Sequence, residues 1–243
     1  MKRLRVPELM DDPSLPEADH RDALEGLRRL NKISSSTSIL WNVLTKIASE
    51  YNRSDNHRAE GYRPLRVLDL ATGSGDLLVE LARLSDSAQE PQNRFDFTGL
   101  DISQTAVNIA QQNARQAGTA VQFQKADIMH DRISSGFDIV MTSLFTHHLD
   151  PDGIEVLFRK VYESDAKVFI VNDLVRSTLS FALVWLASRI VTRSHVVHFD
   201  GPVSVRAAYT PHELREMAAA AGLSNCSTEL HPPCRQLLIW RRP

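Results

Sequence analysis

From Leu65 onward, short apolar runs alternate with stretches in which apolar residues recur every three to four positions. Short runs bounded by turn residues are typical of strands, and the longer periodic stretches are typical of helices. Strands are predicted at 66–70, 96–100, 121–125, 137–143 and 167–172, and helices at 75–84, 103–117, 153–164 and 211–221. This alternation favours an α/β fold with a parallel sheet.

Two late apolar runs, 224–230 and 235–240, are separated only by His231-Pro232-Pro233. Such a short connection joins neighbouring antiparallel strands more readily than parallel ones. We therefore predict an antiparallel pair at one edge of the sheet.

The first 64 residues differ from the rest in pattern. Leu24, Leu27 and Leu30 share one helical face within 18–30, and a second apolar stripe runs through 39–49. The stretch 51–64 is polar. We predict an N-terminal helical extension, 1–64, followed by a main domain, 65–243.

Between the fifth predicted strand and the last helix lies a long insertion, 173–210. A structureless loop of this length is unusual in a compact domain, so a helical cap is expected. Its segment 178–191 is apolar nearly all round. It is either a helix buried against the N-terminal helices, or a lid that lines an apolar tunnel or touches a membrane surface.

Composition limits the class of protein. Among 243 residues, 42% are hydrophobic and 24% charged, as in ordinary globular domains. The net charge of −2 argues against a general polyanion binder. Two cysteines, Cys226 and Cys234, form neither a disulfide framework nor a zinc site. With no signal-like apolar start and no run of ~18 apolar residues, we expect a cytoplasmic protein.

The strongest motif is Val67-Leu68-Asp69-Leu70-Ala71-Thr72-Gly73-Ser74-Gly75-Asp76, a strand that enters a glycine turn and then a helix. Glycines let the backbone approach a ligand, and the helix N-terminus offers unpaired N–H groups. Leu78 stands where a dinucleotide fingerprint has its third small residue, which disfavours nicotinamide-dependent chemistry. A buried Asp69 would need a cationic or hydrogen-bonding partner.

Acidic residues follow the next two strands. Asp101 can accept both hydroxyls of a ribose, or it can cap the helix 103–117. Asp127 can accept an amino hydrogen of adenine while Ile128 packs on the ring; alternatively, Asp127 forms a turn.

With these motifs the chain resembles the class I S-adenosylmethionine (SAM)-dependent methyltransferases over roughly residues 65–240. The loop 68–76 is similar to that of the C-methyltransferases of ubiquinone and menaquinone biosynthesis, which also carry alanine at the position of Ala71. The resemblance implies a Rossmann-like, doubly wound, mostly parallel seven-stranded sheet with an antiparallel edge strand. It also implies that a helical cap and the extension 1–64 cover the active site.

The resemblance further implies that SAM is the cofactor and S-adenosylhomocysteine the product. The residues that it assigns to the cofactor stand at the ends of strands: Asp69, Ala71, Thr72, Gly73, Gly75, Asp101, Ile102, Asp127, Ile128 and Ser143. From the N-terminal region, Arg29 or Asn31 could reach the methionine carboxylate, or both are structural.

Methyl transfer to a phenol or a hydroquinone carbon is helped by proton removal, and histidine is the usual base. His148 is the first candidate and His147 the second, although either can simply pack beneath the cap. Asp173 and Arg176 either face the acceptor or form a structural ion pair.

A second polar set, His195, His198, Asp200 and Arg206, lies in the insertion, with a turn predicted at Gly201-Pro202. It is expected to form either a solvated loop or a hydrogen-bonded lid, because a His-x-x-His spacing alone is a weak metal signal. No metal is predicted.

These features predict SAM-dependent methyl transfer to oxygen or carbon of a small lipophilic aromatic, quinone-precursor or polyketide-like acceptor. A non-catalytic SAM-binding or scaffold protein is the alternative, followed by a protein or nucleic-acid methyltransferase. No basic stripe is present, and the Asp/Asn-Pro-Pro-aromatic motif of base-directed enzymes is absent. We expect no nucleic-acid partner and no transmembrane segment, with peripheral membrane contact possible and a monomeric or homodimeric state.

Overall fold

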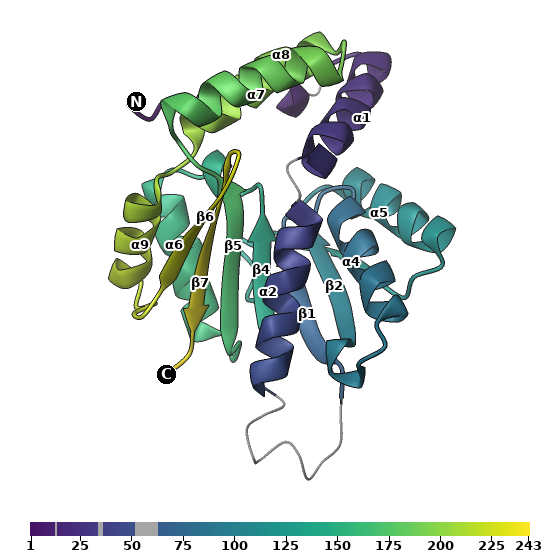
Figure 1. Cartoon of the computed structure of the whole chain (residues 1–243), viewed down its shortest axis with the longest axis vertical. Coiled ribbons are helices and arrows are strands. Elements are labelled where there is room, and N and C mark those ends of the chain that lie inside the picture. Colours follow the sequence, from purple (N-terminus) through teal and green to yellow (C-terminus); the bar gives the residue numbers. More distant parts are fainter. Residues whose placement is uncertain (13, 34–35, 52–62) are drawn as a thin grey trace.

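The computed structural model describes residues 1–12, 14–33, 36–51 and 63–243, and in them a seven-stranded sheet lies between helices (Figure 1). Along the sheet the order is β3-β2-β1-β4-β5-β7-β6. The strands are β1 (Leu65–Leu70), β2 (Phe95–Asp101), β3 (Gln122–Lys125), β4 (Ile139–Ser143), β5 (Val168–Leu174), β6 (Ser227–His231) and β7 (Arg235–Arg241). Strands β1 to β5 are parallel, and β7 runs antiparallel to both β5 and β6. The predicted fold class is confirmed, with the reversed strand second from the edge.

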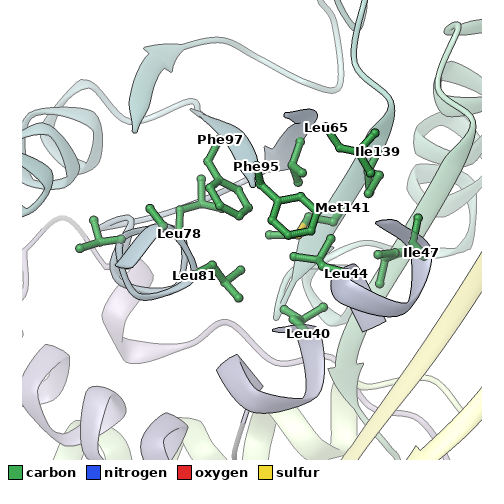
Figure 2. Close-up of a cluster of buried hydrophobic side chains, with 14 of the residues drawn as sticks. Leu40, Leu44, Ile47, Leu65, Leu78, Leu81, Phe95, Phe97, Ile139 and Met141 are labelled. Atoms are coloured by element: carbon green, nitrogen blue, oxygen red, sulfur yellow. The ribbon is translucent and has the colours of Figure 1, made fainter. Parts of the chain in front are cut away.

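Helices cover the two faces of the sheet as the alternation of side chains requires. On one face lie α2 (Ser36–Tyr51), α4 (Asp76–Ser87) and α5 (Gln104–Ala117); on the other lie α6 (Pro151–Glu163) and α9 (Pro211–Ala220). Along β1, Val67 belongs to the first core cluster and Leu68 to the second, because successive strand residues point to opposite faces. Figure 2 shows Leu44 of α2 among the side chains of the first cluster.

Helix α2 departs from the prediction that the whole extension 1–64 covers the active site. It lies along the sheet, where Leu40 and Leu44 are fully buried in the first core cluster (Figures 1 and 2). The apolar stripe of 39–49 therefore serves the main core. The part of the polar stretch 51–64 that comprises residues 52–62 falls outside the described residues.

Shortening a side chain on this stripe is expected to destabilise the fold. Ile47 is 5% exposed, so Ile47→Val should lower the free energy of unfolding by about 0.5–1.5 kcal/mol through a lost methyl contact. Lys46→Ala, on the exposed side of the same helix, should change it by less than about 0.5 kcal/mol. Urea unfolding measures both, and equal values for the two variants would argue against α2 as a core helix.

Three helices form a cap over the carboxyl ends of the strands: α1 (Glu17–Ile33), α7 (Thr178–Val191) and α8 (His195–Ala207) (Figure 1). The insertion is thus a helical cap, as predicted. The turn predicted at Gly201-Pro202 is wrong, because both residues lie inside α8. A Cβ on Gly201 would lie 3.1 Å from Val184 Cγ1, so glycine allows α7 and α8 to approach closely. This buried packing offsets the backbone hydrogen bond that Pro202 cannot donate.

The N-terminal segment before α1 is fastened to this cap. Asp200 of α8 accepts hydrogen bonds from the backbone N–H groups of Leu9 and Met10, at 2.7 and 3.1 Å. His198 Nε2 lies 2.9 Å from the Thr192 carbonyl oxygen. Two members of the set predicted in the insertion, His198 and Asp200, therefore form hydrogen bonds within the lid and to the N-terminal segment. In the described ranges, no helix has the length and apolarity needed to cross a membrane.

Candidate active site

The loop between β1 and α4 contains three residues with a left-handed backbone conformation. Ala71, Gly73 and Gly75 have φ angles of 59°, 58° and 71°. A Cβ on Gly75 would lie 2.5 Å from the Phe123 ring, so side-chain packing requires glycine there. A Cβ on Gly73 would meet none of the described atoms within 4 Å. The loop is therefore tightly packed at Gly75, whereas at Gly73 it leaves open space that a ligand can use.

Asp69 lies within β1 just before this loop. Its side chain is buried, and Oδ1 has no hydrogen-bond partner among the described residues; the same holds for the hydroxyl of Thr72. Burial raises the pKa of Asp69 to about 7. A buried carboxylate oxygen without a hydrogen-bond partner is costly, so a donor group of a bound ligand would stabilise the charged form of Asp69.

Asp101 ends β2 and contacts the glycine loop directly. Its two carboxylate oxygens accept hydrogen bonds from the backbone N–H groups of Gly73, at 2.8 Å, and Ser103, at 2.9 Å. The cap of α5 is Ser103, whose hydroxyl accepts from the Ala106 N–H, so Asp101 is not the helix cap. Each oxygen of Asp101 keeps a lone pair for a ligand hydroxyl. The neighbouring Ile102 is 62% exposed and offers an apolar surface beside it.

Asp127 and Ile128 follow β3, and the structure gives both residues local roles. The Asp127 carboxylate accepts from the Met129 N–H, at 3.0 Å, and lies 2.8 Å from His130 Nδ1, which lowers its pKa. This is the turn-forming geometry that the sequence left open. Ile128 is buried in the second core cluster. Their contact with an adenine ring stays a prediction.

Ser143 ends β4 beside the centre of the sheet. Its Oγ accepts a hydrogen bond from Asn172 Nδ2 at 3.0 Å, which links the ends of β4 and β5. The strand order reverses between β1 and β4, and ligands of open α/β sheets bind where such a reversal leaves a crevice. Ser143 and the glycine loop therefore share the edge at which a cofactor is expected.

A buried histidine–aspartate pair stands at the same edge of the sheet. His147 lies in a short 3₁₀ turn, Thr146–His148, and its Nδ1 is 2.7 Å from Asp173 Oδ1 on β5. The carboxylate can only accept, so this nitrogen carries the proton and Nε2 is left to act. The other oxygen of Asp173 accepts from the Thr146 hydroxyl and the His147 backbone N–H.

Electrostatics favour a charged pair here. Burial alone would lower the pKa of His147, but the charge of Asp173, its hydrogen bond and the charge of Glu8 outweigh burial and raise it. Burial alone would raise the pKa of Asp173, yet the charge and hydrogen bond of His147, with other donors, lower it to about 2. Asp173 is therefore positioned to stabilise the imidazolium form of His147.

Glu8 and His148 flank this pair. Glu8 Oε1 lies 3.7 Å from His147 Nε2, and burial raises the pKa of Glu8. The ring of His148 stacks on that of His147 with a centroid distance of 4.3 Å. Burial, with the charge of His147, lowers the pKa of His148 to about 4. Sequence reasoning missed Glu8, because nothing in a polar N-terminal segment signals that it reaches a site after β4.

The remaining candidates have structural partners. Arg176 forms an ion pair with Glu213 of α9, so the predicted alternative of an Asp173–Arg176 pair is wrong. Arg29 pairs with Glu25 one helical turn away, on the surface of α1. Asn31 accepts a hydrogen bond from Arg235 at 2.9 Å and also lines the cavity described next.

A cavity of about 280 Å³ lies between the cap and the ends of β4 and β5. Its walls are largely apolar and come from α1, α7 and the loops after the two strands: Leu27, Leu30, Leu144, Leu174, Leu183 and Val184. Glu8, His147 and His148 belong to its polar lining, together with Asn31, Ser204 and Arg235. An apolar chamber with a few convergent polar groups is the usual form of a small-molecule site.

Glu8, His147 and His148 in the polar lining are residue types that bind metals, but their ligand atoms are farther apart than those of a zinc site. One ligand atom each from Glu8, His147 and His148 can be chosen so that all lie within 4.8 Å of one another. Ligand atoms about 2.1 Å from a tetrahedral zinc ion lie about 3.4 Å apart, so these side chains would have to move closer. The prediction that no metal is used stays a prediction.

Comparison with known proteins identifies the family. Residues 63–222 match the family model described as a methyltransferase domain. The chain belongs to this methyltransferase family. The predicted membership among the class I SAM-dependent methyltransferases is confirmed, and SAM is the cofactor that this class uses.

The relatives of the chain have names that point to different substrates. It is 30% identical over 117 residues to ribosomal protein L11 methyltransferase of Dictyoglomus turgidum, which covers 48% of the chain and 35% of that relative. It is 28% identical over 176 residues to demethylmenaquinone methyltransferase of Thermus thermophilus, which covers 66% of the chain and 75% of that relative.

Solved structures support the fold. The plantazolicin methyltransferase BamL, in complex with a desmethylplantazolicin analogue and S-adenosylhomocysteine, superimposes with a TM-score of 0.65 at 16% identity, over 95% of this chain and 92% of that one. The chain spans about a third to a half of the length of three curated relatives that it matches.

Proposed function

We propose that the protein transfers the methyl group of SAM to an oxygen or carbon of a small, lipophilic, aromatic acceptor in the cytoplasm. Phenols, quinone precursors and polyketide-like rings are the classes that fit. The observation that carries this proposal is the apolar cavity beneath the cap, whose wall includes His147, hydrogen-bonded to the buried Asp173. Apolar walls favour a lipophilic acceptor, and one buried base suits an acidic O–H or C–H group.

The cofactor side of the proposal rests on the glycine loop. Asp69 Oδ1 and the Thr72 hydroxyl are buried without partners among the described residues, and Gly73 opens onto free space. Asp69 would bind the amino group of the methionine moiety, and Asp101, beside Ile102, the ribose. When bound, SAM supplies a methyl group already activated by its sulfonium centre.

His147 is proposed as the base in preference to His148. Its Nε2 takes the proton of the acceptor, and Asp173 orients the ring and stabilises the imidazolium that forms. His148, with a pKa of about 4, has little affinity for a proton at neutral pH. It packs against the His147 ring and holds it against the cavity. The apolar walls orient the acceptor, and this positioning supplies much of the rate.

The first experiment is calorimetric titration with S-adenosylhomocysteine, with NADH as the control ligand. Saturable micromolar binding of the first alone supports the cofactor assignment; binding of NADH alone overturns it. Purified protein with methyl-labelled SAM is then tested on matched phenols that differ only in the length of an alkyl substituent. Turnover that rises with alkyl length supports a lipophilic acceptor.

The alternatives give different outcomes in the same assay. A non-catalytic SAM-binding or scaffold protein binds S-adenosylhomocysteine and methylates no phenol. A protein or nucleic-acid methyltransferase labels macromolecules of a lysate and leaves the phenols unlabelled. One relative is a ribosomal protein L11 methyltransferase, so the assay includes a lysate to detect a protein acceptor.

Loss of the Asp101 carboxylate is expected to weaken cofactor binding. Asp101→Ala removes an acceptor that fixes the Gly73 N–H and is proposed to hold the ribose. The Kd for S-adenosylhomocysteine should rise at least about tenfold, equivalent to about 1.4 kcal/mol. Asp96→Ala, an exposed acid on the same strand, is the matched control and should bind normally. An unchanged Kd for Asp101→Ala would mean that Asp101 does not bind the cofactor.

Metal removal is expected to leave the reaction unchanged. Because His147 hydrogen-bonds Asp173 and keeps Nε2 for the proton, the proposed mechanism needs no cation. Dialysis against a chelator should therefore preserve full turnover, and adding zinc should inhibit by occupying Glu8, His147 and His148. Loss of turnover on chelation, restored by a divalent ion, would contradict this mechanism.

A further inference from the structure

Helix α7 is apolar on two neighbouring faces. Leu183, Val184 and Ala187 line the cavity. On the outer face, Leu179, Leu186 and Ile190 are 67%, 51% and 74% exposed. Their spacings of seven and four residues put them on one helical stripe. The residues of the inner face line the cavity, whereas the exposed outer stripe has no packing role among the described residues.

Aromatic and basic side chains border this stripe. Trp185 is 44% exposed, and the Arg189 guanidinium stacks on its ring, 4.0 Å from the centroid. Phe199, on the adjacent helix α8, is also exposed. Arg193 is exposed just past the end of α7, and the sequence has no acidic residue between Leu174 and Phe199. The surface therefore combines exposed aliphatic groups and aromatic rings with two exposed arginines, in a stretch of sequence that has no acidic residue.

This combination is typical of a helix that lies in the interface of a bilayer. Aliphatic groups enter the acyl region, tryptophan sits at the headgroup level and arginines contact anionic phosphates. With 14 residues, α7 is too short to span the bilayer. A protein partner or a second copy could also cover an apolar stripe, but the local excess of cations favours an anionic lipid surface.

We infer that the outer face of α7, with Phe199 of α8, docks the protein on an anionic lipid surface. The docking face consists of Leu179, Trp185, Leu186, Arg189, Ile190, Arg193 and Phe199. The inner face of the same helix lines the cavity, so docking places the cavity next to the bilayer. A cavity next to the bilayer would give a lipophilic acceptor a route into the site, and this consequence rests on the proposed function. The docking itself does not rest on it.

Vesicle flotation tests the docking face without any acceptor. The full chain is expected to float with vesicles of phosphatidylcholine containing about one third phosphatidylglycerol, more weakly with phosphatidylcholine alone, and less at high salt. The double variant Leu186→Ser/Ile190→Ser should lose at least about tenfold in apparent affinity. Val156→Ser/Leu230→Ser is the matched control, because these exposed apolar residues lie on α6 and β6; it should float like the parent.

Tryptophan fluorescence gives a second readout at one residue. Of the three tryptophans, Trp240 is fully buried and Trp41 packs against Phe95 in the core, whereas Trp185 is on the docking face. Anionic vesicles should shift the emission to the blue, and brominated lipid should quench it. Trp185→Phe should lose this signal while still floating.

Three outcomes overturn the inference. They are absence of flotation with anionic vesicles, equal flotation of the two double variants, and a dimer that dissociates only in Leu186→Ser/Ile190→Ser. The last would assign the face to a second copy of the chain. Normal binding of S-adenosylhomocysteine by a protein that fails to float would refute docking alone and leave the proposed function standing.

Discussion

Replacing His147 by glutamine is expected to lower kcat by about 10²–10⁴-fold with little change in the Kd for S-adenosylhomocysteine. The loss is expected because His147 is the histidine of the cavity wall, among the described residues, whose pKa is raised: the charge and hydrogen bond of Asp173 outweigh burial there. Glutamine can still donate a hydrogen bond to Asp173, so the buried carboxylate is not left without a donor. Single-turnover kinetics with labelled methyl donor measures the effect.

The matched controls separate catalysis from packing. His148→Gln should retain more activity, because His148 contributes stacking rather than proton transfer. His198→Gln, within the cap, should be close to the parent enzyme, since that ring bonds only the Thr192 carbonyl among the described groups. Full activity in both His147→Gln and His148→Gln would mean that positioning alone carries the reaction.

The pH profile tests the same base independently. His147 must be neutral to take a proton, and Asp173 raises its pKa, so kcat/KM should rise with pH with a midpoint above the ordinary histidine value of 6.5. Asp173→Asn removes the charge that favours the imidazolium. The midpoint should therefore move to lower pH while the plateau rate falls. An unchanged midpoint in Asp173→Asn would mean that Asp173 does not affect the pKa of the catalytic base.

The fold was predictable because its signals are local and agree with one another. Short apolar runs bounded by turn residues marked the strands, and the switch to helical spacing marked α4, α5, α6 and α9 within a few residues. The failures occurred where tertiary packing overrides local preference. Pro202 lies inside α8 because the helix is buried against α7, and α2 serves the core although it precedes the predicted main domain.

The candidate site was predictable only in part, for a related reason. A glycine turn and an acid at a strand end can be recognised in the sequence, so the loop around Gly73 and Asp101 could be proposed from spacing alone. Glu8 is 139 residues from His147, and only the folded chain brings it there. Sequence also ranked His148 first, because nothing local says which of two adjacent rings faces the carboxylate of Asp173.

Adding one methyl group at Gly75 is expected to be far more damaging to stability than at Gly118. Both residues are left-handed, with φ of 71° and 69°, so each alanine costs about 1–2 kcal/mol from the backbone. At Gly118 the added Cβ meets no described atom within 4 Å, whereas at Gly75 it would lie 2.5 Å from Phe123 and 2.8 Å from Ala110. Displacing these neighbours adds about 1–3 kcal/mol. Urea unfolding should therefore give about 2–5 kcal/mol for Gly75→Ala and about 1–2 kcal/mol for Gly118→Ala.

Gly73→Ala completes the comparison, because its backbone is equally left-handed and its Cβ would point into open space. Its loss of stability should match that of Gly118→Ala, since neither methyl group displaces a neighbour. If the space above Gly73 holds the cofactor, this variant alone should combine that small loss with a rise in the Kd for S-adenosylhomocysteine of at least about tenfold, or about 1.4 kcal/mol. Equal Kd values for S-adenosylhomocysteine in Gly73→Ala and Gly118→Ala would mean that the cofactor does not occupy the space above Gly73. A methyl group added where a ligand packs closely would weaken binding of that ligand.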